Sequence, residues 1–124
     1  MRVISASDVP ASTSPVSQGK SGGGFVFVGG QMPRDMQSGI IVDGAEAQAF
    51  LSLEYCMRIL REIGAGPEHV MLAFVYLTEL SAKEAVNKAF TFYFPTHPPA
   101  RNLVEVSEIG DGAIVEIGVI ALAP

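Results

Sequence analysis

The sequence is poor in the residues that build disulfides and metal centres. It has one cysteine, two histidines and no tryptophan among its 124 residues. A single cysteine excludes an intrachain disulfide framework, and the helical pattern around Cys56 predicts that it is a small buried apolar side chain. One cysteine with His69 and His97 supplies too few ligands for a recognisable metal cluster, so we predict no metal.

Basic residues and long apolar runs are also scarce. Eight Lys and Arg against thirteen Asp and Glu give a formal net charge of −5, which would repel a phosphate backbone, so nucleic acid is not an expected partner. The apolar runs are short, and residues 1–21 hold no leader-like apolar stretch, so we expect no membrane span and a cytoplasmic protein. A chain of this length, 48% hydrophobic, predicts one domain over residues 1–124.

What the sequence does have is a succession of β-rich runs and helical patterns. The apolar run 25–33 ends in glycines and predicts a central strand buried on both faces, and 69–77 predicts a second apolar strand. Helical spacing begins after Asp43 and again after Ser81, each followed three residues later by a glutamate in the form of a capping pair. The residues before the first run predict short strands and loops.

The last two β-rich runs, 100–106 and 113–122, flank Gly110, Asp111 and Gly112, which predicts a hairpin. The resulting order of elements implies crossover connections, with both helices on one face of a mixed sheet in a two-layer α/β or α+β sandwich.

One face of such a sheet would be bare. Alternation predicts apolar side chains on the uncovered face, and exposed apolar sheets seek partners, so we expect an oligomer. The alternative is that all of these residues face the helices. They are Phe25, Phe27, Val115, Ile117 and Val119.

The usual catalytic motifs are absent, which leaves Arg101 as the most specific candidate for a functional residue. No serine lies in a nucleophile-elbow context, and the glycine-rich stretch 21–25 leads into a strand rather than a helix, unlike a phosphate loop. Arg101 follows Pro98 and Pro99, which restrict the backbone, and a guanidinium binds a carboxylate through two parallel hydrogen bonds. We predict a preorganised seat for a small carboxylate. The alternative is a surface arginine after a proline turn.

Glu116 is the second candidate, because it interrupts an apolar run where a buried charge needs a partner or a function. If the hairpin forms, Arg101 and Glu116 lie near the same end of the sheet, and the carboxylate could hold a water or shuttle a proton. The alternative is an outward-facing glutamate on an exposed edge. Glu105 is expected to be a solvent-facing residue of that kind.

Four stretches resemble, in order and spacing, the RidA/YjgF family of enamine and imine deaminases. They are SQGKSGGGFVFVGGQMPRDMQSGIIV, VYLTELSAKEAVNKAF, FPTHPPARNLVEV and GAIVEIGVIA. The resemblance spans nearly the whole chain, and the segment around Arg101 combined with the GGQMP turn is its most specific part. It implies a chorismate-mutase-like α+β fold with a barrel-like homotrimeric core, three sites in the clefts between subunits, and hydrolysis without metal or cofactor.

The resemblance also assigns roles to residues. By it, Arg101 binds the substrate carboxylate, Glu116 positions the attacking water, and Gly30, Gln31 and Asn87 line the same cleft. The reaction implied is hydrolysis of 2-imino or enamine carboxylic acids to 2-oxo acids and ammonia.

The sequence departs from the family pattern at four positions. Val16 and Leu103, both expected in the cleft, replace a common tyrosine and a common cysteine, while Gly29 and Gly118 replace a serine and a second glutamate. The changes make the expected pocket less polar. They favour a substrate bulkier than 2-iminopropanoate, such as an aminomuconate-type enamine acid, or else a non-catalytic paralogue that binds a carboxylate metabolite or a protein. A ribonuclease role is disfavoured by the acidic charge and the lack of a basic stripe.

Overall fold

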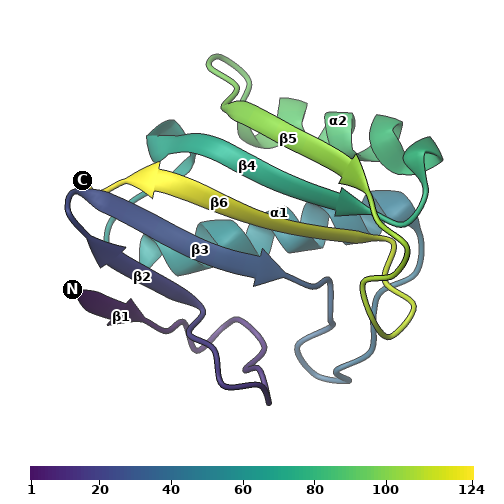
Figure 1. Ribbon diagram of the computed structural model, residues 1–124, viewed down its shortest axis with the longest axis horizontal. Coiled ribbons are helices and arrows are strands. Elements are labelled where there is room, and N and C mark those ends of the chain that lie inside the picture. Colours follow the sequence, from purple (N-terminus) through teal and green to yellow (C-terminus); the bar gives the residue numbers. More distant parts are fainter.

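The computed structural model describes all 124 residues as a six-stranded mixed sheet with two long helices on one face (Figure 1). The strands follow one another across the sheet in the order β1-β2-β3-β6-β4-β5. Their bounds are β1 Arg2–Ile4, β2 Gly19–Gly22, β3 Phe25–Gln31, β4 Val70–Leu77, β5 Ala100–Glu105 and β6 Val115–Leu122. Helix α1 spans Ala45–Arg61 and α2 spans Lys83–Tyr93, and short 3-10 turns cover Pro67–His69 and Leu80–Ala82. The expected order of strands and helices is confirmed.

The predicted hairpin between the last two strands is wrong. β6 lies between β3 and β4 and runs antiparallel to both, while β5 pairs in parallel with the far side of β4. The two strands are therefore separated by β4. The strand compositions account for this, because β6 is almost wholly apolar and suits the interior of the sheet, whereas β5 carries Arg101, Asn102 and Glu105 and suits an edge.

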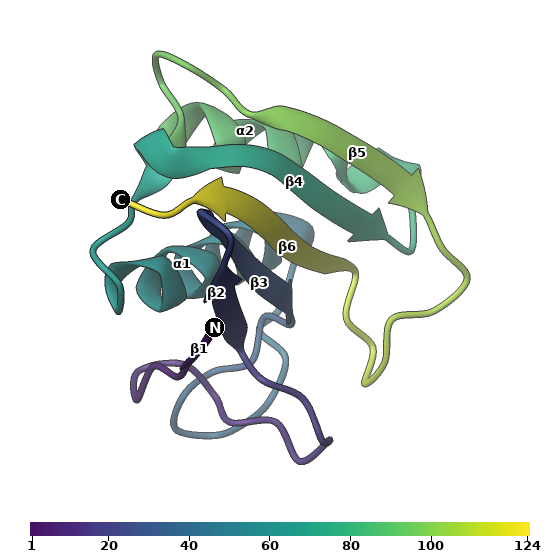
Figure 2. The same ribbon diagram turned by 60° about the vertical axis from the view of Figure 1, so that its left-hand side comes forward.

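The helices cover one face of the sheet and leave the other bare, as Figure 2 shows from the side. Val115, Ile117 and Val119 lie on the covered face and are fully buried, so their predicted place on the bare face is wrong. Phe25 and Phe27 do lie on the bare face, with 40% and 49% of their surface exposed, so β3 is buried on one face only. The same face carries Leu72, Phe74, Tyr76, Val104, Ile120 and Leu122. The bare apolar face itself is confirmed.

Both helices begin without the predicted side-chain caps. The residue before α1 is Gly44, at a φ of 91°, so Asp43 lies one position too early to cap the helix. Ser81 lies inside the 3-10 turn that leads into α2, and that turn supplies backbone bonds in place of a side-chain cap.

Helix α1 is tied to the centre of the sheet. Cys56 is fully buried, and its Sγ lies 3.3 Å from the carbonyl oxygen of Ile117 on β6, which confirms the prediction for this residue. The side-chain oxygen of Gln48 accepts hydrogen bonds from the backbone N–H groups of Ile114 and Val115. Neither helix has the length and hydropathy needed to cross a bilayer.

Three loops meet at one end of the sheet. The antiparallel pairing of β2, β3 and β6 brings together the loop before β2, the loop after β3 and the loop before β6 (Figure 1). They comprise residues 5–18, 32–44 and 106–114. Loops held on a rigid sheet are common places for binding sites, and the candidate residues lie at this end of the sheet and at the start of β5.

Candidate functional site

Arg101 is part-buried and has no acidic partner. It lies on β5 opposite Ala73 of β4, on the face covered by helices, and its guanidinium carbon is 4.9 Å from the ring centroid of Phe90 on α2. The guanidinium makes no hydrogen bond or ion pair within the chain. Burial lowers the pKa of Arg101, yet an arginine stays protonated at neutral pH. Its charge is therefore available to an incoming anion.

A hollow of about 380 Å³ surrounds this side chain, and we call it the arginine hollow. It is lined by Asn87, Phe90, Thr91, Phe94, Pro95, Pro98, Pro99 and Arg101. Asn87 and Phe90 are three residues apart on α2, which places both on the same face of the helix. The two prolines also line the hollow, so a stiff segment, an aromatic ring and an amide lie around the free guanidinium.

Glu116 lies on β6 on the bare face of the sheet, among apolar side chains. Burial raises the pKa of its carboxyl group, and the group makes no hydrogen bond or ion pair within the chain. A side chain at Gly30 would collide with it, because an ideal Cβ there would overlap Oε1 of Glu116. Gly30 thus leaves room for the carboxylate against β3.

The raised pKa of Glu116 gives stability a pH dependence of known sign. The folded state prefers the protonated carboxyl group, so the ionised form costs stability above the raised pKa, and that cost disappears as pH falls through it. We expect Glu116→Gln to raise Tm at about pH 7, with a gain that shrinks on acidification. Thermal melts followed by circular dichroism would measure it, with Glu108→Gln as an exposed control. A lower Tm for Glu116→Gln at neutral pH would reveal an ionic partner instead.

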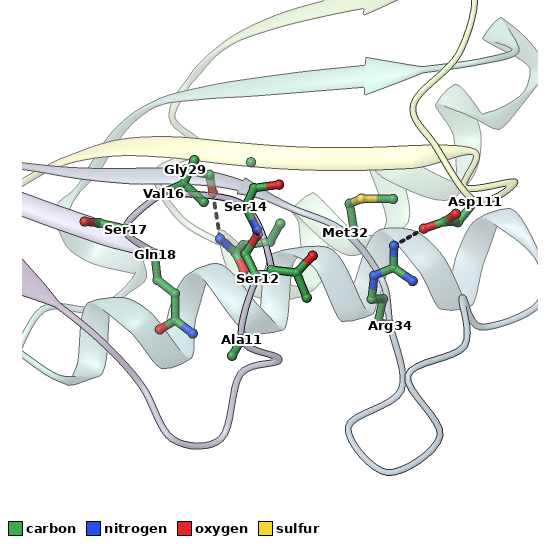
Figure 3. Close-up of a pocket in the computed structure, with 13 residues that line it drawn as sticks. Ala11, Ser12, Ser14, Val16, Ser17, Gln18, Gly29, Met32, Arg34 and Asp111 are labelled. Carbon is green, nitrogen blue, oxygen red and sulfur yellow. Dashed lines mark hydrogen bonds and ion pairs between the residues drawn. The ribbon is translucent and has the colours of Figure 1, made fainter.

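A second, larger hollow of about 730 Å³ opens among the three loops, and we call it the serine hollow. It is lined by Ala11, Ser12, Thr13, Ser14, Val16, Ser17, Gln18, Gly29, Gly30, Gln31, Met32, Arg34 and Asp111. Only three of these 13 residues are hydrophobic. Figure 3 shows Arg34 and Asp111 joined by an ion pair at one end of the hollow and Val16 and Gly29 at the other.

The predicted site residues fall into two groups within one chain. Arg101, Leu103 and Asn87 belong to the helix-covered side, with Leu103 two positions after Arg101 and opposite Val75 of β4. The other group, made of Val16, Gly30, Gln31 and Glu116, belongs to the serine hollow and its edge.

The two candidate catalytic residues, Arg101 and Glu116, do not meet in one chain. They pair with Ala73 and Tyr76 of β4, from opposite sides of that strand. Three positions along a strand put side chains on opposite faces, so Arg101 and Glu116 point away from each other across the sheet. The hairpin that would have brought Arg101 and Glu116 to the same end of the sheet does not form, because β4 separates β5 from β6.

Comparison with known proteins decides the family. The family described as endoribonuclease L-PSP matches residues 6–123. A RutC family protein of Pyrococcus abyssi is 36% identical over 96% of this chain and 94% of its own length. The chain belongs to the RidA/YjgF family. A 2-iminobutanoate/2-iminopropanoate deaminase of Salmonella typhimurium is 30% identical over 98% of this chain and 97% of its own length.

Solved structures of the RidA/YjgF family share the whole fold. RidA from a Psychrobacter species superposes with a TM-score of 0.93 at 29% identity, covering 98% of this chain and 99% of that one. Escherichia coli TdcF, solved with bound serine, gives a TM-score of 0.93 at 28% identity over 98% of both chains. The expected α+β fold, with a mixed sheet and two helices, is therefore confirmed as that of RidA/YjgF proteins.

The structure shows what surrounds Val16 and Gly118, two of the residues that depart from the RidA/YjgF pattern. Val16 is 67% exposed on the wall of the serine hollow, where its isopropyl group offers no hydrogen bond. Gly118 lies against the irregular part of β3, and an ideal Cβ there would be 3.0 Å from the carbonyl oxygen of Val28. A side chain at position 118 would require β3 to shift by a few tenths of an ångström, so the close packing of β6 against β3 favours glycine there.

Phe90 and the pair formed by Arg34 and Asp111 were not predicted from the sequence. Phe90 had a signal, since it follows Asn87 at helical spacing and both precede the proline segment. Arg34 and Asp111 are 77 positions apart in the sequence, and only the folded sheet brings their loops together.

Proposed function

We propose that this RidA/YjgF protein hydrolyses 2-imino and enamine carboxylic acids. In the balanced reaction, water adds to the carbon of the C=N bond of R–C(=NH)–COO⁻, the C–N bond breaks, and R–C(=O)–COO⁻ and ammonia leave. Support comes from the family and from the relative named as a 2-iminobutanoate/2-iminopropanoate deaminase. An enamine enters the same reaction after its tautomer, the imine, has formed.

The observation that carries the proposal is the free guanidinium of Arg101. The other four arginines each donate a hydrogen bond to an oxygen atom of the chain, whereas Arg101 donates none and contacts only the ring of Phe90. The ring fixes its position without neutralising its charge. An anionic ligand with two oxygens in one plane fits such a fork, and a 2-imino acid carries that group next to the reacting carbon.

We further propose that the site is completed between copies of the chain in a homotrimer. Arg101 and Glu116 lie on opposite faces of one sheet, so a substrate gripped by Arg101 cannot reach Glu116 of the same chain. The bare apolar face around Glu116 supports association, because it would be covered by a second copy. In this arrangement Arg101 of one copy and Glu116 of its neighbour face one cleft.

In that cleft the chemistry needs positioning rather than a cofactor. The carbon of a C=N bond that is protonated at nitrogen is already electrophilic, so positioning a water molecule next to it accounts for much of the rate. The Glu116 carboxylate would accept a hydrogen bond from that water and then its proton, and burial, which raises the pKa of Glu116, makes it a better proton acceptor. Gly30 keeps the carboxylate close to β3, and Asn87 is placed to hydrogen-bond the substrate beside Arg101.

The direct test generates 2-iminobutanoate with threonine dehydratase and follows its decay by capture with semicarbazide. The protein is expected to lower the initial rate of semicarbazone formation, because it converts the imine to 2-oxobutanoate, which reacts more slowly with semicarbazide. An initial rate that does not depend on the protein would overturn the proposal. Sedimentation of the same preparation gives the oligomeric state.

A second candidate is a carboxylate-binding protein without catalysis, favoured by the missing hydroxyl at Val16. It predicts saturable binding of 2-oxobutanoate by calorimetry with no acceleration of imine decay. The family description also names an endoribonuclease. The net charge of −5 argues against that activity here, and incubation with labelled RNA is the matching control.

Phe90 provides a further prediction about Arg101. Replacing the ring by leucine keeps an apolar side chain but removes the cation–π contact, which contributes about 0.5–2 kcal/mol. We expect Phe90→Leu to raise KM for the imine roughly 2- to 30-fold while kcat changes little. Phe90→Tyr retains the ring and should keep the parent KM. A loss in kcat alone would place the role of Phe90 elsewhere.

A further inference from the structure

The wall of the serine hollow made by Arg34 and Asp111 has no role in the reaction described above. Arg34 comes from the loop after β3 and Asp111 from the loop before β6, and their side chains form an ion pair (Figure 3). The side chains are 31% and 65% exposed, so the pair faces the hollow and solvent rather than the core. It lies in the same hollow as Gly30, which contacts Glu116.

The pair offers both kinds of hydrogen-bonding group. Arg34 donates through Nη1 to the carbonyl oxygen of Gly39, 3.1 Å away, and through Nη2 to Oδ2 of Asp111. A guanidinium has more N–H donors than these contacts use, and Oδ1 of Asp111 accepts no bond within the chain. A free donor and a free acceptor are therefore held side by side, and the pair as a whole carries no net charge.

We propose that Arg34 and Asp111 form a subsite that selects substrates whose far end carries a carboxamide or another uncharged group that both donates and accepts hydrogen bonds. This inference rests on the proposed deaminase function. A carboxamide can accept from Arg34 through its oxygen and donate to Asp111 through its nitrogen. The hydroxyl groups of Ser12 and Ser14 add further polar partners elsewhere in the same hollow.

Two other classes of substrate fit this wall poorly. An aliphatic end would bury the donor and the acceptor without partners, which costs binding. A second carboxylate would meet the charge of Asp111, which already occupies Arg34. The wall therefore disfavours both the apolar and the dicarboxylate substrates that the sequence departures alone suggested.

A matched pair of substrates tests the proposal. Asparagine and leucine have side chains of nearly the same shape, and L-amino-acid oxidase with catalase converts them to imines that end in a carboxamide or in two methyl groups. We expect kcat/KM to be about tenfold higher for the asparagine-derived imine, the factor that one or two well-formed hydrogen bonds give. 2-Iminopropanoate, which has no polar group at its far end, serves as the reference.

Two variants locate the preference. Arg34→Met is expected to abolish the tenfold ratio, whereas Arg2→Met, at a distant arginine, leaves it intact. Asp111→Asn changes an exposed side chain, keeps an acceptor and removes the charge, so it should admit the aspartate-derived imine, which ends in a carboxylate. If Arg34→Met fails to fold, Asp111→Asn still decides the matter.

The outcomes separate this inference from the proposed function. Hydrolysis of 2-iminopropanoate with equal rates for the two longer imines overturns the subsite and leaves the deaminase standing. If no imine is hydrolysed, the deaminase fails, and calorimetry then compares 2-oxosuccinamate with 4-methyl-2-oxopentanoate. Tighter binding of 2-oxosuccinamate, lost in Arg34→Met, supports the subsite, and equal or absent binding overturns it.

Discussion

Replacing Arg101 with alanine is expected to lower kcat/KM for 2-iminobutanoate about 30- to 1000-fold, since a two-pronged charge-assisted pair contributes about 2–4 kcal/mol. Fold stability should change little, because Arg101 makes no hydrogen bond or ion pair within the chain and loses only its contact with Phe90. The semicarbazide assay measures the rate, and a thermal melt checks the fold.

Two controls give the Arg101 result its meaning. Arg101→Lys keeps the positive charge but not the planar fork, so its activity should fall between those of the parent and of Arg101→Ala. Arg2→Ala removes an exposed arginine of β1 and should leave kcat/KM at the parent value. An Arg101→Ala protein as active as the parent would remove the assigned role and leave the family and the fold unaffected.

Mixing two inactive variants is expected to restore activity. If each site uses Arg101 of one copy and Glu116 of its neighbour, then random trimers from equal amounts of Arg101→Ala and Glu116→Gln contain intact sites. About one quarter of all sites would then have both residues, and the mixture would regain about one quarter of parental activity. The variants are unfolded together, refolded and assayed beside each variant alone.

A second mixture separates the two arrangements of the site quantitatively. An equal mixture of parent protein and the double variant, Arg101→Ala with Glu116→Gln, should show about one quarter of the activity of the same total amount of parent protein if sites lie between copies, but about one half if each site lies within a chain. No recovery in the first mixture, together with one half in the second, would overturn the intersubunit site. Because Arg101 and Glu116 lie on opposite faces of the sheet, we expect about one quarter of parental activity in both mixtures.

Much of the fold could be predicted from local pattern, but the neighbours of each strand could not. The strand at Val70–Leu77 and both helices follow from apolar spacing within each segment. The place of β6 between β3 and β4 depends on competition among all the strands for interior positions, which a turn sequence such as Gly110 to Gly112 does not encode. A short turn suggested a hairpin, and the burial of an apolar strand outweighed it.

The candidate site shows the same division. Arg101 stood out because prolines precede it, and Gly30 lies in a glycine pair whose second member leaves space for Glu116. Side chains that meet through the sheet, such as Arg34 and Asp111, leave no trace in local spacing. The faces of Arg101 and Glu116 also required the strand register, since a shift of one residue reverses a side chain's direction.

The burial of Cys56 gives the chain a built-in reporter of its own opening. The thiol lies between α1 and β6, it is fully buried, and burial raises its pKa, so a disulfide reagent in solution cannot react with it in the closed molecule. Labelling therefore requires α1 to separate from the sheet, and its rate under native conditions measures how often that occurs. The rate of opening can thus be measured on the wild-type chain without introducing another cysteine. A ligand that slows labelling has been bound by the closed form.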